Sequence, residues 1–125
     1  MSQFSGQRYI VVESYRRNGE GVKTPVWFIE QGGKLYIWTI ASSGKAKRIQ
    51  NNHRVRVSPS SFGGGLKGYW VEAQARFMEP VTATPITGLM RRKYGFQFWL
   101  LNRFHGKGRV IIEIEPYAMD KMDLL

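Results

Sequence analysis

Apolar and polar residues alternate over most of this chain, a period of two that predicts β-strands rather than helices. The first such stretch, 9–15, is rich in β-branched and aromatic residues, and the turn signal Asn18-Gly19-Glu20-Gly21 follows it. Pro25 lacks a backbone donor and indicates an edge or irregular position in the next strand. The same alternation predicts the remaining strands at residues 22–30, 34–39, 54–58, 68–78 and 109–115.

Helical spacing interrupts the alternation in two places. Ser43 can cap a short helix that Asn51-Asn52 would end. Thr84-Pro85 is typical of a helix start with Gly95 as its stop, and another short helix is predicted over 96–104. Six strands and these helices predict a mainly β (α+β) fold, a small antiparallel barrel whose short helices plug its ends.

Composition limits the classes of protein that fit. A chain of 125 residues is expected to form one domain, 1–125. The absence of cysteine excludes disulfides, thiolate zinc sites and cysteine nucleophiles. With no apolar run of signal-peptide or membrane-spanning length, a soluble cytoplasmic protein without membrane association is expected. The net charge of +10 favours a polyanionic partner, either nucleic acid or an anionic cofactor, and ordinary solubility is the competing explanation.

The stretch 39–48, Thr-Ile-Ala-Ser-Ser-Gly-Lys-Ala-Lys-Arg, carries the strongest chemical signal. Hydroxyls, backbone N–H groups and cations converge at one turn, as a phosphate group requires. It is not a P-loop, because Thr39 and Ala46 stand where that motif needs Gly and Ser or Thr. The competing interpretation is a solvated basic helix face.

The other motifs give little evidence of a binding or catalytic site. Gly63, Gly65 and Gly68 match the letters of a dinucleotide fingerprint but precede a predicted strand instead of opening a helix. His53 and His105 lack the spacing of metal ligands, so no metal site is predicted. There is no nucleophile elbow. Four scattered glutamates are expected to be exposed, which leaves the catalytic residues unassigned: Glu13, Glu20, Glu30 and Glu72.

Seven segments follow one another in a characteristic order and spacing. They are Arg8-Tyr9-Ile10-Val11, Asn18-Gly19, Thr24-Pro25-Val26-Trp27-Phe28, Gly33-Lys34-Leu35-Tyr36-Ile37-Trp38-Thr39, Ser43-Gly44-Lys45-Ala46-Lys47-Arg48-Ile49, Arg92-Lys93-Tyr94-Gly95 and Val110-Ile111-Ile112-Glu113-Ile114. Together they resemble the pyridoxamine 5′-phosphate oxidase-like flavin-binding split-barrel superfamily, and most closely its deazaflavin (coenzyme F420)-dependent branch. The resemblance covers nearly the whole chain, and the order and spacing of the segments carry it.

The resemblance implies a six-stranded antiparallel split β-barrel with short flanking helices that forms a homodimer, with the cofactor in a groove between the subunits. It implies F420 or FMN as cofactor and hydride transfer to or from a small-molecule substrate. The phosphate motif of the oxidase branch reads Thr-Asn-x-x-Ser-Arg-Lys. Thr39, Ser43 and Lys45 match it, whereas Ile40 and Gly44 replace the Asn and the Arg. The missing guanidinium argues against authentic pyridoxamine-phosphate oxidase activity and favours the deazaflavin over FMN.

Transferred by position, the resemblance implies a complete set of cofactor-binding residues. The phosphate would be held by Ser43, Lys45, Lys47 and Arg48, and the ring and ribityl groove would be lined by Thr24, Pro25, Val26 and Thr39, with Trp38 beside the ring. Arg54 or Arg56 would help with a longer anionic tail.

Three functions remain in competition at this point. The first is a flavin- or deazaflavin-dependent oxidoreductase. The second is a non-catalytic module of the same fold that binds flavin or haem. The third, which the resemblance makes less favoured, is a basic barrel that binds nucleic acid, with the aromatic residues stacking on bases.

Overall fold

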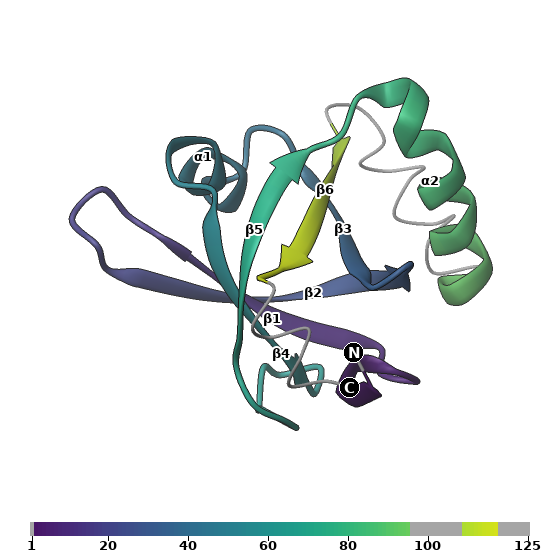
Figure 1. Cartoon of the computed structure of the whole chain (residues 1–125), viewed down its shortest axis with the longest axis horizontal. Coiled ribbons are helices and arrows are strands. Elements are labelled where there is room, and N and C mark those ends of the chain that lie inside the picture. Colours follow the sequence, from purple (N-terminus) through teal and green to yellow (C-terminus); the bar gives the residue numbers. More distant parts are fainter. Residues whose placement is uncertain (1, 96–108, 118–125) are drawn as a thin grey trace.

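The computed structural model describes residues 2–95 and 109–117, which form a six-stranded β-barrel with two α-helices (Figure 1). In chain order the elements are η1 (Ser2–Phe4), β1 (Tyr9–Tyr15), β2 (Gly21–Gln31), β3 (Lys34–Ile40), α1 (Gly44–Asn51), β4 (Arg54–Ser60), β5 (Val71–Phe77), α2 (Pro80–Tyr94) and β6 (Arg109–Pro116). All neighbouring strands are antiparallel in the order β1-β2-β3-β6-β5-β4, and β4 pairs with β1 to close the barrel. The predicted barrel is confirmed.

The barrel interior is filled by one face of each strand, as the alternation predicts. In β1, for example, Ile10 and Val12 point into this cluster while Val11 does not. Ala73 and Ala75 of β5 are fully buried there. The cluster consists of Phe4, Ile10, Val12, Val26, Phe28, Leu35, Ile37, Ile49, Val55, Val57, Val71, Ala73, Ala75, Ile112 and Ile114.

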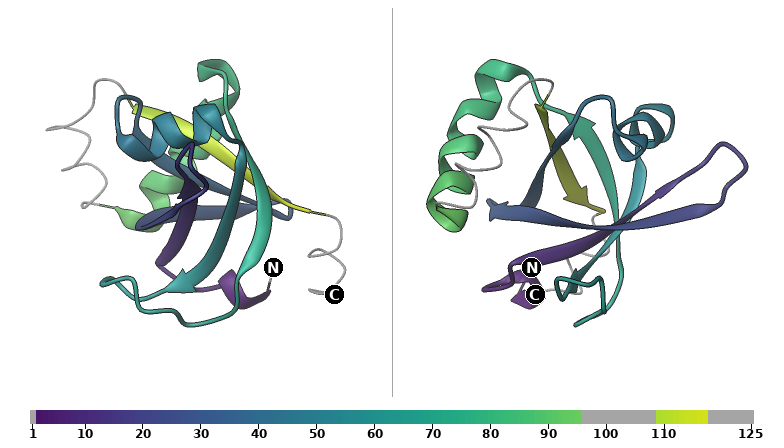
Figure 2. Two further views of the ribbon diagram at one scale, coloured as in Figure 1. Left: turned by 90° about the vertical axis from the view of Figure 1, so that its left-hand side faces the viewer. Right: turned by 180° about the vertical axis from the view of Figure 1, so that it is seen from behind.

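Helix α1 plugs one end of the barrel, as predicted. The Ser43 hydroxyl caps it by accepting a hydrogen bond from the Ala46 backbone N–H at 3.1 Å. Ala46 and Ile49, three residues apart, are both buried, and Ile49 belongs to the interior cluster. Because the helix follows β3 directly, it is held at the end of that strand (Figure 2).

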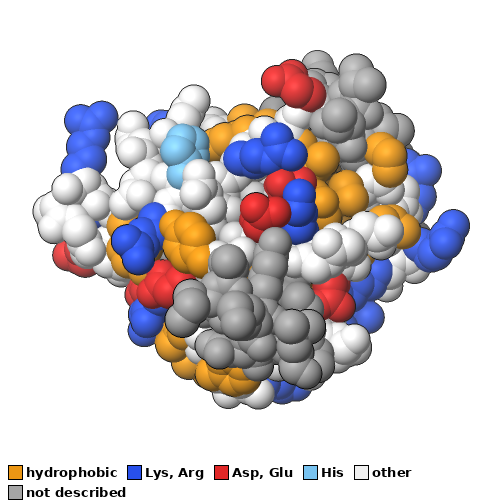
Figure 3. Space-filling view, in the orientation of Figure 1, with side chains coloured by type: hydrophobic (Ala, Val, Ile, Leu, Met, Phe, Trp, Pro, Cys, Tyr) orange, Lys and Arg blue, Asp and Glu red, His pale blue; other side chains and the backbone are white. Residues whose placement is uncertain are grey.

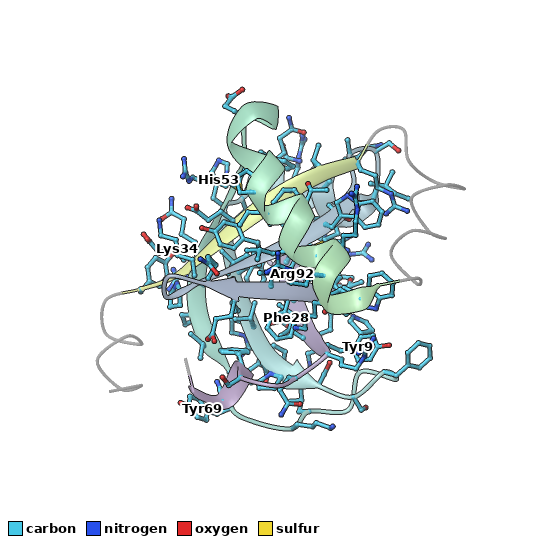
Figure 4. The ribbon with its side chains drawn as sticks, turned by 90° about the vertical axis from the view of Figure 1, so that its right-hand side faces the viewer. Tyr9, Phe28, Lys34, His53, Tyr69 and Arg92 are labelled. Atoms are coloured by element: carbon cyan, nitrogen blue, oxygen red, sulfur yellow. The ribbon has the colours of Figure 1, made fainter. Side chains whose placement is uncertain are left out.

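Helix α2 does not plug an end, contrary to the prediction. It lies against the outer face of the barrel, over β2 and β6 (Figure 4), where it covers a second apolar cluster. Tyr94 anchors it: its ring stacks on Trp27 with centroids 4.4 Å apart, and its hydroxyl accepts a hydrogen bond from the Phe28 N–H at 2.9 Å. The same hydroxyl donates to the Arg8 carbonyl at 2.7 Å.

Several predicted boundaries were wrong. Helix α2 begins at Pro80 instead of Thr84-Pro85, because Pro80 occupies the first turn equally well and Pro85 lies inside the helix. Strand β5 begins at Val71 instead of residue 68, and β4 continues to Ser60, with Pro59 paired to Ile10. The helix predicted over 96–104 lies outside the described residues.

The outer face of β3, β5 and β6 carries a carboxylate network. Glu113 is buried, and its carboxylate accepts hydrogen bonds from Arg76 Nε at 2.8 Å and from the Tyr36 hydroxyl at 3.2 Å. Lys34 Nζ lies 3.5 Å from Glu113 and 3.3 Å from Glu115. On the face shown in Figure 3, acidic and basic side chains lie side by side.

The turns between strands use glycine where the backbone requires positive φ. Gly19 has φ of 89° in the β1–β2 turn, and Gly32 and Gly33 have φ of 61° and 79° in the β2–β3 turn. The turn predicted at residues 18–21 is therefore confirmed, and each of the two turns joins a pair of antiparallel strands. None of the described helices has the length and apolar character needed to cross a membrane.

Candidate functional site

Strands β2 and β3 separate halfway along their length. They pair only between Phe28–Gln31 and Lys34–Ile37. Before that, β2 pairs with β1, whereas β3 continues from Trp38 to Ile40 in pairing with β6 (Figure 1). Pro25 therefore lies in a part of β2 that is paired on one side only among the described strands, in keeping with the sequence prediction.

The predicted groove residues lie on the two sides of this separation. Thr24, Pro25 and Val26 belong to the diverging half of β2, and Trp38 and Thr39 to that of β3. Their exposure differs, because alternate residues of a strand face opposite sides. Val26 and Thr39 are buried, Trp38 and Thr24 are half-buried, and Pro25 is exposed. Val26 packs inside the barrel, so only its backbone is available to a ligand.

Three cations gather where β3 passes into α1, and we call them the Lys45 cluster: Lys45, Arg48 and Arg109. Lys45 and Arg48 are half-buried on α1, and the electrostatic influence of Arg48 and Arg109 reaches the Lys45 ammonium. Among the described residues, no carboxylate forms an ion pair with Lys45. An anion stabilises a half-buried ammonium that lies beside two guanidiniums and has no acidic partner in the described part of the chain.

The pKa values of all three cations in the cluster are lowered. Burial, with added repulsion from Arg48 and Arg109, lowers the pKa of Lys45 to about 8. Burial, and then repulsion from Arg16, lowers the pKa of Arg48, and burial lowers that of Arg109. A bound anion would favour the charged form of all three groups.

Arg109 was missed by the sequence analysis. It is the first residue of β6, opposite Ile40 at the end of β3, and its guanidinium lies 4.0 Å from the centre of the Trp38 ring. It reaches the cluster because β6 is inserted between β3 and β5. The only local signal was a cation at the start of a predicted strand.

Gly44 and Arg48 are coupled in space. A Cβ atom at position 44 would lie 3.0 Å from Arg48 Nη1. The Arg48 guanidinium is also oriented by the hydrogen bond from its Nε to the Ser14 hydroxyl, at 2.8 Å. Arg48 thus brings a guanidinium beside Gly44.

The remaining predicted phosphate ligands are placed differently. The Ser43 oxygen already accepts the capping hydrogen bond from Ala46, which leaves its hydroxyl proton free to donate. Lys47 is exposed and lines a cavity with Arg16 and Arg17, so the structure does not bring it to Lys45. Two residues of a helix are rotated by about 200°, which puts Lys45 and Lys47 on opposite sides of α1.

Arg54 and Arg56, the residues expected to assist with an anionic tail, have acidic neighbours in the structure. Arg56 Nε donates to Glu13 Oε1 at 2.7 Å, and its guanidinium lies 4.5 Å from the centre of the Trp70 ring. Arg54 lies 3.9 Å from Glu72. The expectation that Glu13 is exposed was wrong: it is buried, because the Arg56 guanidinium compensates its charge.

A cavity of ≈340 Å³ between η1, β2 and α2 contains an acid and a base that the sequence did not indicate. Lys93 Nζ donates to the Phe28 carbonyl at 2.9 Å, and burial lowers the pKa of Lys93 to about 8. Burial raises the pKa of Glu30, whose Oε2 is buried without a hydrogen-bond partner among the described residues. Shifted pKa values within one cavity are typical of functional sites.

No protein-family model matches this sequence, and comparison with curated proteins finds no significant match. Solved structures are similar in fold. HutZ, the haem storage protein of Vibrio cholerae, superposes with a TM-score of 0.76 at 10% identity, covering 94% of this chain and 87% of that one. A pyridoxamine 5′-phosphate oxidase candidate from Listeria innocua has a TM-score of 0.69 at 16% identity, covering 94% and 90%.

An FAD-binding protein from Mesorhizobium loti adds a third structure, with a TM-score of 0.71 at 13% identity, covering 94% of this chain and 86% of that one. These identities are low, so the similarity concerns the fold. The chain has the split-barrel fold found in proteins that bind flavin or haem.

Proposed function

We propose that this chain binds a flavin-type cofactor, coenzyme F420 or FMN, and holds its phosphate at the Lys45 cluster. The observation that carries this proposal is the half-buried Lys45 ammonium, which has two guanidiniums beside it and no carboxylate partner among the described residues. One ammonium and two guanidiniums fit a phosphate, because their donors are charge-assisted and the guanidinium forks are bidentate.

In this proposal the separated strands hold the rest of the cofactor. The Thr24–Val26 backbone and the Thr39 segment line the ring and ribityl chain, and Trp38 contacts the ring. Arg109, which stacks on Trp38, links the phosphate end to the ring end. When bound, the cofactor supplies the hydride chemistry, and the protein supplies binding and orientation. The reaction is then a hydride transfer to or from a small molecule.

We further propose that the active form is a homodimer in which the second subunit completes the groove. On one side of the separation, β2 pairs only with β1 among the described strands, which leaves room for residues of a second copy. Sedimentation analysis checks this: a dimer is expected at micromolar concentration. A monomer that binds cofactor with full affinity would contradict it.

The absorbance spectrum of the purified protein, followed by titration with FMN and with F420, tests the cofactor assignment. Lys45→Ala should weaken cofactor binding by about 1.5–3 kcal/mol, on the order of 10- to 100-fold, because a charged hydrogen bond is lost. Lys67→Ala, which removes the same charge from an exposed loop residue, is the control and should bind as wild type. A protein that binds neither cofactor would overturn the assignment.

The similarity to the haem storage protein HutZ supports one alternative, a non-catalytic module of this fold. Haem also carries carboxylates that cations can hold, so the Lys45 cluster alone does not choose between the two ligands. A haem titration in parallel makes the choice. Tight haem binding without flavin binding, or a bound flavin that no electron donor reduces, would favour the module over the oxidoreductase.

A further inference from the structure

A second group of cations surrounds a cavity of ≈460 Å³ on the other side of α1. This volume lies within the range of about 300–1,000 Å³ that is usual for ligand pockets. Its lining includes four basic side chains and two amides: Arg16, Arg17, Lys47, Arg48, Asn51 and Asn52. The described residues that line it include no carboxylate. We call this feature the hairpin cavity.

Local structure sets the two walls of the hairpin cavity. On one side, the β1–β2 turn carries Arg16 and Arg17, and it is closed by hydrogen bonds from Arg16 N–H to the Glu20 carbonyl and from Gly19 N–H to the Arg16 carbonyl, both at 2.8 Å. This turn extends beyond the barrel on the side of α1 (Figures 1 and 2). On the other side, Lys47 and Asn51 are four residues apart on α1 and therefore share a face.

Positive charge dominates this space. Two carboxylates lie close by. Glu20 Oε1 is 3.6 Å from Arg16 Nε in an exposed pair, and exposed pairs contribute little, while Glu13, which accepts a hydrogen bond from the cavity residue Tyr15, is already paired with Arg56. The C-terminal carbonyls of α1 add the equivalent of about half a negative charge. Four cations thus exceed the available negative charge. Burial lowers the pKa of Arg48, and repulsion from Arg16 lowers it further.

We propose that the hairpin cavity binds a compact polyanion, a ligand with at least two phosphate or carboxylate groups. Three guanidiniums provide forks for bidentate recognition of such groups, and Lys47 adds a point charge. Arg48 borders both this cavity and the Lys45 cluster, so the two sites are adjacent. The proposal goes beyond the cofactor assignment and does not depend on which cofactor binds, or on whether one binds at all.

Titration calorimetry with inorganic tripolyphosphate at low salt tests the proposal. The informative variant is the double substitution Arg17→Ala with Lys47→Ala, because both residues are exposed and neither belongs to the Lys45 cluster. Its matched control is Lys23→Ala with Lys67→Ala, which removes the same net charge from exposed residues elsewhere. Arg48 is left intact because it serves both sites.

We expect the Arg17/Lys47 variant to bind tripolyphosphate at least tenfold more weakly than wild type, and the control variant to change by less than threefold. An equal loss in both variants would mean that net charge alone attracts the anion, and this would overturn the proposal. So would unchanged binding in the Arg17/Lys47 variant. A single-stranded oligonucleotide that binds more tightly than tripolyphosphate and needs the same residues would replace the compact ligand with nucleic acid.

Two further measurements separate this proposal from the cofactor assignment and identify the ligand's extent. Lys45→Ala should still bind tripolyphosphate with an affinity that depends on Arg17 and Lys47; loss of that dependence would overturn the hairpin cavity as a site. The affinity of Lys45→Ala for tripolyphosphate then shows whether this ligand also reaches the Lys45 cluster. A weaker affinity that still depends on Arg17 and Lys47 indicates one ligand that spans both sites, and an unchanged affinity indicates a ligand confined to the hairpin cavity.

Discussion

On the outer face of β3, β5 and β6, Lys34 and Arg76 converge on the buried carboxylate of Glu113, whereas the Lys45 ammonium lies beside two guanidiniums and forms no ion pair with a carboxylate of the described residues. The pKa shifts run in opposite directions. Hydrogen bonding to Glu113 raises the pKa of Arg76, and Glu115 and Glu113 raise that of Lys34. In the Lys45 cluster, all three pKa values are lowered.

The difference separates a network whose charges the protein satisfies from the site proposed for an anion. Around Glu113 the partners lie within the protein, so removing the buried carboxylate would leave them uncompensated. In the Lys45 cluster the protein holds like charges together, at a cost in folding free energy that a bound anion would offset. The placement of acidic residues thus decides whether a half-buried cation such as Lys34 or Lys45 has a partner within the described part of the protein.

The largest expected effect is on the satisfied network. Glu113→Gln should lower the free energy of unfolding by about 2 kcal/mol, because a buried carboxylate loses its charge-assisted hydrogen bonds. Chemical denaturation measures this. In contrast, Lys45→Met should leave the stability of the protein unchanged or higher, because it removes an uncompensated charge. A stability loss of similar size in both variants would contradict the comparison.

The same network predicts an acid dependence. The pKa of Glu113 is lowered from its ordinary value of 4.5, chiefly by the hydrogen bond from Arg76. A carboxyl group with a lowered folded-state pKa contributes stability that is present above pH 4.5 and is lost as the pH falls through the folded-state value. Glu113→Gln should therefore show a smaller loss of stability than wild type between pH 5 and pH 3, when each is measured relative to its own value at pH 7.

An intermediate effect is expected for anion binding to the Lys45 cluster as the pH rises. Because the pKa of Lys45 is about 8, the free protein at pH 9 must take up a proton to bind an anion. The charge of sulfate does not change between pH 7 and pH 9. Sulfate should therefore bind about tenfold more weakly at pH 9 than at pH 7, a loss of about 1.4 kcal/mol in binding free energy. Lys45→Arg should remove most of this dependence. The same slope in both proteins would exclude Lys45 as its source.

The smallest effect concerns the space that Gly44 leaves for Arg48. Gly44→Ala should weaken sulfate binding by roughly two- to fivefold, because the new methyl group displaces the Arg48 guanidinium. Gly88→Ala is the matched control: no neighbouring atom lies within 4 Å of its Cβ position, so it should gain about 0.5–1 kcal/mol of stability and leave sulfate binding unchanged. Equal affinity in all three proteins would mean that Arg48 does not contribute.

Local sequence patterns predicted much of the fold correctly. The alternation in 9–15 predicted the bounds of β1, and the Ser43 cap with Ala46 and Ile49 on one face predicted α1. These features depend on neighbours within a few residues, which is the range that sequence periodicity reports. The start of α2 was predicted wrongly for the same reason. Two prolines in one helical stretch are equally good local signals for a helix start, and packing against β2 and β6 decides between them.

The sequence by itself determined that six strands alternate, that a capped basic helix follows the third, and that Lys45 and Arg48 lie on that helix. Only the tertiary structure decided which charges are compensated. Barrel closure inserts β6 beside β3, which brings Arg109 to Trp38 and Glu113 to Tyr36, and it buries Glu13 against Arg56. These pairs are separated by tens of residues, and strand pairing over such distances depends on the whole barrel rather than on any local pattern.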